Sequence, residues 1–340
     1  MTTALPEFAD TPQGVERLDH FMARATADYY AMRDPFQDFA TSPELSQAFG
    51  ECLGLWAAVT WQALGRPDPV LLVECGPGRG SLMADALRAI AEMMPEFRMA
   101  LRVHLVETSL RLRKVQAEKL GAIDITWHAE VTTLPKAPMI LLANEFLDAL
   151  PIRQFIRRGA SWHERHVACG AFVELPCDVA LPADAPEGAI QEVNEAAQRF
   201  AIWLGARLKR HGGAALLIDY GPAESGFGDS LQAMRAGQPV DPLITPGEVD
   251  ITAHVDFATF AAAARAAGAV AHGPLPQGVF LQRLGFMTRA AMLARLDPAR
   301  AQAQLAAAHR LTAPEAMGRL FKALALCDSN LPIPAGFETA

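Results

Sequence analysis

Short apolar runs alternate with helix-like periodicity through the middle of the chain. The strand candidates are mainly aliphatic and lie at 69–74, 101–107, 124–128, 139–144 and 214–220. Apolar residues recur at helical spacing before and between them, in 12–31, 81–93, 109–120 and roughly 187–210. This alternation is typical of an α/β fold with a doubly wound, mainly parallel sheet, which binds ligands beyond the carboxyl ends of its strands. We therefore expect the functional site at that edge.

Regions outside this alternation complete the expected organisation, which is one elaborated domain. Residues 152–181 read as β-hairpins inserted after the fourth strand, 221–250 as a long loop without a clear period, and 288–327 as helical. The expected boundaries are an N-terminal helical segment that contributes to the site (1–66), a sheet core (67–151 and 182–287), a β-hairpin insertion (152–181) and a C-terminal helical extension (288–340).

Composition narrows the possible functions. The 340 residues are 51% hydrophobic, which is ample for a sizeable core, and the net charge of -8 disfavours nucleic-acid binding. The five cysteines form no CxxC pair, which favours free thiols in a reduced compartment. The N-terminus lacks a secretory h-region and the composition of a transit peptide, and no apolar run reaches membrane-spanning length. We therefore expect a cytoplasmic protein without membrane insertion.

A glycine-rich turn, VECGPGRGSL, joins the first strand candidate to a helix that begins near Ser81. Gly76, Gly78 and Gly80 permit a sharp turn and a close approach of the backbone to a ligand. The third glycine falls one residue too early for a dinucleotide fingerprint, and no G-K-[ST] follows, which excludes a P-loop. The spacing E-x-G-x-G-x-G, beginning at Glu74, instead resembles motif I of class I S-adenosylmethionine (SAM) methyltransferases. A tight turn without a ligand is the alternative.

Glu107 ends the next strand candidate, in LVET. An acid at this position can accept hydrogen bonds from both hydroxyls of a cofactor ribose. NAD enzymes use an acid in the same way, so Glu107 alone does not distinguish a methyltransferase from an oxidoreductase. An ordinary surface acid is the alternative for this residue.

Several longer segments are similar to the MidA-type SAM-dependent methyltransferases, which include the mitochondrial complex I assembly methyltransferases and their bacterial relatives. The matching segments, in family order, are DFATSPELSQAFGE (38–51), LVECGPGRGSLMADALR (72–88), LANEFLDALPIRQF (142–155), WHERHV (162–167), LIDYG (217–221), GDSLQAMRAG (228–237), PGEVDITAHVDF (246–257) and MGRLFKAL (317–324). TSPELSQ, NEFLDALP and DITAHVDF are strongly specific when they occur in one chain. The departures are MRDPFQDF, where the family usually has a Gly-containing GDF, and Cys75 in place of a more usual Leu.

The resemblance implies a class I SAM-methyltransferase fold, Rossmann-like, with S-adenosyl-L-methionine as the cofactor. The residues expected to bind it are Glu74, Gly76, Gly78, Gly80, Glu107, Asn144 and Ser42. The mitochondrial relatives imply a protein-arginine N-methyltransferase that acts on a protein substrate, a core subunit of complex I. The sequence leaves the oligomeric state open, and a homodimer is one of the options.

The segment NEFLDALP places an amide and two carboxylates at the end of the fourth strand candidate. In class I methyltransferases, methyl donor and acceptor meet at this edge. An arginine acceptor is a planar cation with a pKa above about 12, so carboxylates can hold its fork and receive its proton. We expect Glu145 as the main catalytic ligand, Asp148 as the second, and Asn144 at the cofactor or the substrate. The alternative is a turn cap at Asn144, a solvated rim acid at Glu145 and a turn residue at Asp148.

Two later segments complete the expected site. Asp219 and Tyr220 end the fifth strand candidate and are expected to bind substrate, as is Asp256. His254 is a candidate catalytic contact and proton acceptor, because the unperturbed pKa of histidine lies near neutrality, although a lone histidine is more often structural. HERH (163–166) lies in an expected strand, where residues i and i+3 face opposite sides, so no metal site is expected.

Three alternatives to a protein-arginine methyltransferase stay open. The long loop at 221–250 could close over a small acceptor, which would make the chain a small-molecule methyltransferase. A non-enzymatic assembly factor could use SAM as a structural ligand. An NAD oxidoreductase is disfavoured by the glycine spacing.

Overall fold

The computed structural model describes residues 14–33 and 41–338. The chain divides into two compact units, and each is described by itself. The sheet unit comprises the described parts of Ala40–Asp148, Gln198–Ser225 and Val255–Ala340. The hairpin unit comprises the described parts of Met1–Phe39, Ala149–Ala197 and Gly226–His254.

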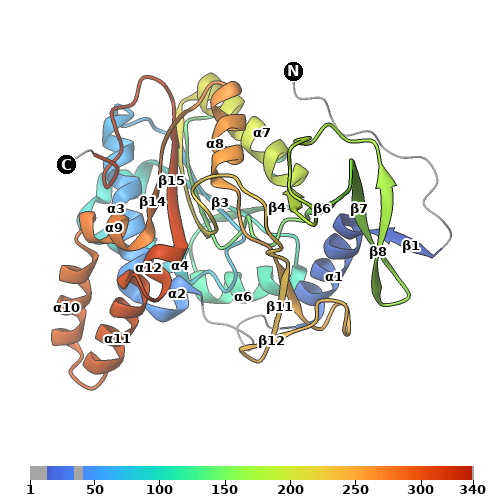
Figure 1. Cartoon of the computed structure of the whole chain (residues 1–340). Helices are drawn as coiled ribbons and strands as arrows, with labels where there is room; N and C mark the ends of the chain where they lie inside the picture. Colours follow the sequence, from blue (N-terminus) through green and yellow to red (C-terminus); the bar gives the residue numbers. More distant parts are fainter. Residues whose placement is uncertain (1–13, 34–40, 339–340) are drawn as a thin grey trace. The chain divides into compact units, whose positions relative to one another are not determined.

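A seven-stranded sheet forms the centre of the sheet unit, in the order β14-β15-β10-β5-β2-β3-β4. Its strands are β2 (Val70–Cys75), β3 (Leu101–Val106), β4 (Ile125–His128), β5 (Met139–Asn144), β10 (Gly213–Tyr220), β14 (Val270–Pro276) and β15 (Phe321–Cys327). The pairs from β10 through β5, β2 and β3 to β4 are parallel, whereas β15, red in Figure 1, is antiparallel to β10 and β14. The predicted α/β fold with a mainly parallel sheet is confirmed.

Helical segments connect these strands. They are α2 (Ser42–Leu45), α3 (Gln47–Ala63), α4 (Ser81–Met93), α5 (Pro95–Ala100), α6 (Leu110–Leu120), η2 (Val131–Thr133), α7 (Glu195–His211), α8 (Phe257–Ala266), α9 (Gln277–Arg283), α10 (Phe286–Leu296), α11 (Ala301–Thr312) and α12 (Met317–Leu320). Side-chain caps start three of these described helices: Ser109 accepts from the N–H of Leu112 at α6, Asn194 from the N–H of Ala197 at α7, and Asp256 from the N–H of Thr259 at α8. None of the helices in the described ranges is long and apolar enough to cross a membrane.

The core of the sheet unit explains its uniformly apolar strands. β2 and β5 are buried at every residue, so their aliphatic sequences suit a sheet covered on both faces. Helices α3 and α4 pack closely against each other, because a Cβ at Gly54 would lie 2.6 Å from the Cα of Ala86. Glycine is therefore required where these helices meet.

The hairpin unit carries helix α1 and two small sheets. Its elements are β1 (Val15–Arg17), α1 (Leu18–Met32), β6 (Arg153–Arg158), β7 (Ser161–Ala168), β8 (Ala171–Cys177), β9 (Ile190–Val193), β11 (Gln232–Arg235), β12 (Gln238–Val240) and β13 (Asp250–Thr252). The first sheet has the order β1-β7-β6-β9, with β8 paired to β7, and the second has the order β12-β11-β13. Leu18, Phe21 and Met22 of α1 pack with Ile251 of β13 in its core.

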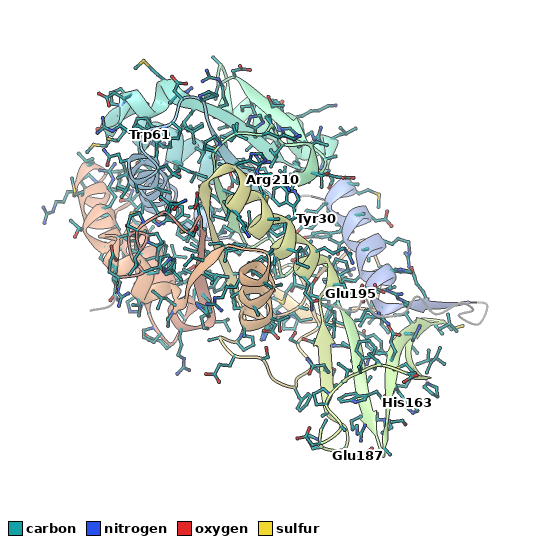
Figure 2. All side chains as sticks on the ribbon, turned by 90° about the horizontal axis from the view of Figure 1, so that it is seen from above. Tyr30, Trp61, His163, Glu187, Glu195 and Arg210 are labelled. Carbon is teal, nitrogen blue, oxygen red and sulfur yellow. The ribbon has the colours of Figure 1, made fainter. Side chains whose placement is uncertain are left out.

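A buried ion pair fixes the first of these sheets. Arg153, which is 2% exposed, donates to both carboxylate oxygens of Glu164 at 2.6 and 2.9 Å and to Glu195 at 2.8 Å. The bidentate geometry satisfies charges that would be costly to bury alone. Figure 2 shows Glu195 at the start of α7, and His163 and Glu187 among the hairpins.

The C-terminal region is not wholly helical, contrary to the expectation for 288–340. Residues Phe321–Cys327 form β15, which pairs with β10 over its whole length. Nearly every residue of β15 is buried, so its sequence shows no alternation. Periodicity cannot separate such a run from a buried helix, and the long-range pairing with β10 decides the outcome.

The region 221–250 also differs from the unstructured loop that the sequence suggests. β11 and β12 form a hairpin whose turn places Ala236 and Gly237 at φ values of 49° and 72°. Strands of three and four residues are too short to show a period of two. These strands belong to the hairpin unit rather than to the expected sheet core.

The remaining differences concern where helices begin. The helix expected at 187–210 starts only at Glu195, after strand β9 at Ile190–Val193. The helix expected at 12–31 is α1, which starts at Leu18. Residues 12 and 13 of that prediction, and 38–40 of the first matching segment, lie outside the described residues.

Candidate active site

The glycine loop leaves the carboxyl end of β2 and enters α4 at Ser81. Gly76, Gly78 and Gly80 have φ values of 63°, 53° and 80°, in the left-handed region that other residues rarely adopt. A Cβ at Gly76 would also lie 3.0 Å from Cδ2 of Phe146, in the turn that follows β5. The loop needs these glycines for its conformation, and it abuts the turn formed by NEFLDALP.

Glu74 precedes the loop, and its side chain is buried inside the sheet unit at 3% exposure. Burial raises the pKa of its carboxyl to about 8, although a hydrogen bond from the N–H of Met83 favours the ionised form. Its Oε2 atom has no hydrogen-bond partner among the described residues. Because an unpaired buried polar atom is unfavourable, this oxygen is a candidate ligand contact.

Glu107 lies directly after β3 and is 8% exposed. Its Oε1 accepts from the N–H of Ser109 at 2.8 Å, and its Oε2 accepts from the side-chain amide of Gln116 at 3.2 Å. Burial raises the pKa of this carboxyl, and the two hydrogen bonds partly offset that effect. Arg113 fixes the turn by donating to the Glu107 carbonyl at 2.8 and 2.5 Å. A carboxylate offers about four lone-pair positions, so capacity remains for hydroxyl donors.

Asn144 and Glu145 lie where β5 ends. Glu145 has a φ of 50°, and its N–H donates to the carbonyl of Ile218 in β10 at 2.9 Å. Its Oε1 accepts from the N–H of Ser42 and from the amide of Asn144, both at 2.9 Å. Burial raises the pKa of Glu145. Asn144 is 8% exposed, and its Oδ1 has no partner within the described ranges.

Asp219 organises the turn that follows Glu145. Its Oδ2 accepts from the N–H groups of Phe146, Leu147 and Asp148 at 3.1, 2.8 and 3.3 Å, and its Oδ1 accepts from Tyr220 N–H at 2.9 Å. The side chain is 1% exposed. Burial, and then the nearby carboxylate of Asp148, raise the pKa of Asp219 well above its usual range. Three carboxyls thus lie together beside the glycine loop.

Helix α2 connects the two sides of this region. The N–H of Ser42 holds Glu145, as described above. The next acid, Glu44, accepts from the hydroxyl of Ser81 at the start of α4, and Lys119 of α6 donates to the same hydroxyl. TSPELSQ therefore contacts both the end of the glycine loop and the NEFLDALP turn.

Comparison with known proteins decides the family. A protein family described as "Putative S-adenosyl-L-methionine-dependent methyltransferase" matches residues 52–275, which is more than half of the chain. The chain belongs to this family. The methyltransferase activity and the S-adenosyl-L-methionine cofactor predicted from the sequence are thereby confirmed.

Two relatives and one solved structure are similar to the methyltransferase over most of its length. The Mus musculus protein named "Protein arginine methyltransferase NDUFAF7, mitochondrial" is 33% identical over 352 residues, which cover 92% of this chain and 80% of that protein. Its Drosophila melanogaster homolog is 31% identical over 366 residues, with 92% and 80% covered. A Burkholderia thailandensis structure bound to S-adenosyl-homocysteine is 29% identical, has a TM-score of 0.79, and covers 95% of this chain and 90% of its own. The class I SAM-methyltransferase fold is confirmed.

The residues of the site fit the cofactor. The unpaired acceptors Glu74 Oε2 and Asn144 Oδ1 suit an ammonium or hydroxyl donor. The carboxylate of Glu107 suits the hydroxyls of a ribose, because its oxygens keep free acceptor positions. The individual roles of these residues stay predictions.

The residues expected to contact substrate have different surroundings. Asp256 accepts from the N–H and hydroxyl of Thr259 and from the hydroxyl of Ser225, each at 2.9 Å, so capping of α8 already accounts for its carboxylate. The ring of Tyr220 packs 5.4 Å from that of Phe321. His254 has an exposed side chain and belongs to the hairpin unit, whereas the other predicted site residues belong to the sheet unit.

Sequence reasoning missed Gln116, which contacts Glu107. A signal for it exists in the periodicity of α6, whose buried residues are Leu112, Gln116 and Leu120. A polar residue in the apolar stripe of a helix, four positions from each apolar neighbour, indicates a buried amide with a specific partner.

Proposed function

We propose that this methyltransferase transfers its methyl group to an arginine side chain of a protein, and that Glu145 holds the acceptor guanidinium. One observation carries the proposal: the carboxyls of Glu145, Asp148 and Asp219 gather on a turn that abuts the glycine loop at Gly76. The relatives named protein arginine methyltransferase support the same acceptor class.

The chemistry of the acceptor suits these carboxyls. S-adenosyl-L-methionine supplies an electrophilic methyl group on a sulfonium, which is already a good leaving group. A guanidinium has five N–H donors in a planar fork and must lose a proton during transfer. Glu145 and Asp148 would orient the fork, and Glu145 would receive the proton, because a carboxyl with a raised pKa is the better base. Alignment of nucleophile and methyl can contribute up to about 7–11 kcal/mol.

The other predicted residues of the site would bind the cofactor, shape the turn or contact the substrate. Asn144 would bind the cofactor or the substrate through its unpaired Oδ1, together with Glu74, Glu107, the loop glycines and Ser42. Asp219 would act by shaping the turn, while Tyr220, His254 and Asp256 stay candidates for substrate contact. A core subunit of complex I is the first protein substrate to test. We place the protein in the cytoplasm, because Cys52, Cys75, Cys169, Cys177 and Cys327 are all free thiols.

The test asks which class of molecule receives the label. Purified protein is incubated with methyl-radiolabelled SAM and a cell extract, with and without an added complex I core subunit. We expect label in a protein band that yields methylarginine on hydrolysis. Label in a small metabolite, or in a protein residue other than arginine, contradicts the proposal. Glu92→Gln, at an exposed position in α4, is the matched control for any acid-to-amide variant of the site.

A further inference from the structure

We propose that Gln116 is a positioning residue for the cofactor, which holds Glu107 and the glycine loop at the spacing that a ribose requires. This inference rests on the assignment of Glu107 to the ribose hydroxyls. Gln116 lies in the middle of α6, is 0% exposed, and has no route to contact a ligand except through its neighbours.

Hydrogen bonds from the Gln116 amide join two separate parts of the cofactor region. One amide N–H group donates to the carbonyl of Gly78, inside the glycine loop, at 2.8 Å. The amide also donates to Oε2 of Glu107, after β3, at 3.2 Å. The glycine loop and the ribose acid come from different strands, so this amide sets the distance between them.

Trp127 of β4 fixes the direction of the Gln116 amide. Its indole N–H donates to Oε1 of Gln116 at 2.9 Å. An indole N–H can only donate, so the amide oxygen must face Trp127 and both amide hydrogens must point toward Gly78 and Glu107. Every polar atom of the Gln116 side chain is thereby used, as expected of a buried amide whose orientation matters.

The consequence concerns Glu107 in particular. Its Oε1 is held by the N–H of Ser109 and its Oε2 by Gln116, so the carboxylate plane is fixed before a ligand arrives. Without the Gln116 amide, the Glu107 carboxylate could rotate and move its Oε2 away from the ribose. Loss of Gln116 should therefore remove recognition of the ribose hydroxyls while leaving recognition of the adenine and the methionine part.

The experiment compares two probes by calorimetry: S-adenosyl-homocysteine and its 2′-deoxyribose analogue. A hydrogen bond to a charged group implies that wild-type protein prefers the natural probe by roughly tenfold to a hundredfold. We expect Gln116→Met to weaken binding of S-adenosyl-homocysteine by about tenfold and to reduce the preference to roughly twofold, with kcat at saturating SAM nearly unchanged.

Gln277→Met is the matched control, because Gln277 of α9 is also 0% exposed and its amide donates to the Leu311 carbonyl at 2.9 Å. It removes a buried amide of the same unit without touching the glycine loop, so its preference should equal that of wild type. Trp127→Phe provides a second route if Gln116→Met fails to fold, since it only releases the amide; its preference should fall about threefold or more.

An unchanged preference in Gln116→Met or in Trp127→Phe overturns the inference, as does an equal loss in Gln277→Met. Wild-type protein that binds S-adenosyl-homocysteine without distinguishing the analogue overturns it too. Wild-type protein that does not bind S-adenosyl-homocysteine at all contradicts the function instead, so the two failures are distinguishable.

Discussion

The donor side and the acceptor side of the site are built from different materials. On the donor side, the loop of Gly76, Gly78 and Gly80 presents backbone in left-handed conformations, and its neighbouring acids are held by nearby amides. On the acceptor side, three carboxyls converge on one turn, and Glu145 is held by an N–H that lies 103 residues earlier in the chain. Backbone conformation is fixed by residue type, whereas a carboxyl cluster is fixed by packing. Substitutions on the donor side should therefore weaken cofactor binding, whereas substitutions on the acceptor side should lower turnover with cofactor binding kept.

The largest expected effect is on the donor side. Gly76→Val places a branched side chain at a φ of 63° and 3.0 Å from Phe146, so we expect SAM binding to weaken by at least roughly a hundredfold, and activity to be lost with it. Calorimetry with SAM measures the affinity. Gly65→Val is the control, because Gly65 has a φ of 82° but nothing within 4 Å of a Cβ. Unchanged SAM affinity in Gly76→Val would contradict the loop assignment.

A substitution on the acceptor side should separate binding from transfer. Glu145→Gln keeps an oxygen to accept from Ser42 but removes the charge and the proton acceptor. We expect kcat to fall by about a hundredfold to a thousandfold while SAM affinity stays within about threefold. The measurement is initial-rate kinetics of methyl transfer beside calorimetry, with Glu92→Gln as control. Turnover at the wild-type rate would remove Glu145 from catalysis.

The difference between local and long-range determinants also explains which features of the site could be predicted from the sequence. The glycine loop and Glu107 are readable because their conformations and positions follow from local order in a strand–turn–helix unit. The sequence predicts Asp219 as an acid at the end of a strand. Its hydrogen bonds from the N–H groups of Phe146, Leu147 and Asp148 could not be predicted, because these residues lie 71 to 73 positions away in the chain. β15 shows the same limit, because its pairing with β10 outweighs its local preference.

Two aspartates should then differ sharply in their effect on stability. Asp219 accepts from backbone N–H groups with both of its oxygens, so in Asp219→Asn the side-chain NH2 group must face either the N–H of Tyr220 or the three N–H groups of the turn, and a buried donor loses its acceptor. We expect a loss of about 1–3 kcal/mol in the free energy of unfolding. Asp256→Asn keeps a good N-cap for α8 and should change it by less than about 0.5 kcal/mol. Chemical denaturation measures both. Equal losses would mean that Asp219 does not organise the turn.

A pH dependence of stability is expected on the donor side, where Glu74 sets it. Its carboxyl has an ordinary pKa of 4.5 and a pKa of about 8 in the folded protein, where burial favours the neutral form. Because the pKa of Glu74 is higher in the folded state than in the unfolded state, protonated Glu74 favours folding. Its contribution to the free energy of unfolding is fully present below pH 4.5 and is lost as the pH rises through about 8. Glu74→Gln, which stays neutral, should lose less stability than wild type between about pH 5 and pH 8.5, by a difference on the order of a few kcal/mol. Denaturation curves at the two pH values measure that difference, and parallel pH profiles for the two proteins would show that Glu74 is ionised in the folded state.

Bound cofactor brings an ammonium group, so saturating SAM should favour the ionised form of Glu74. The difference in stability between wild type and Glu74→Gln should then become smaller. Such a change would link the pH dependence to the donor side rather than to the carboxyls of the acceptor side.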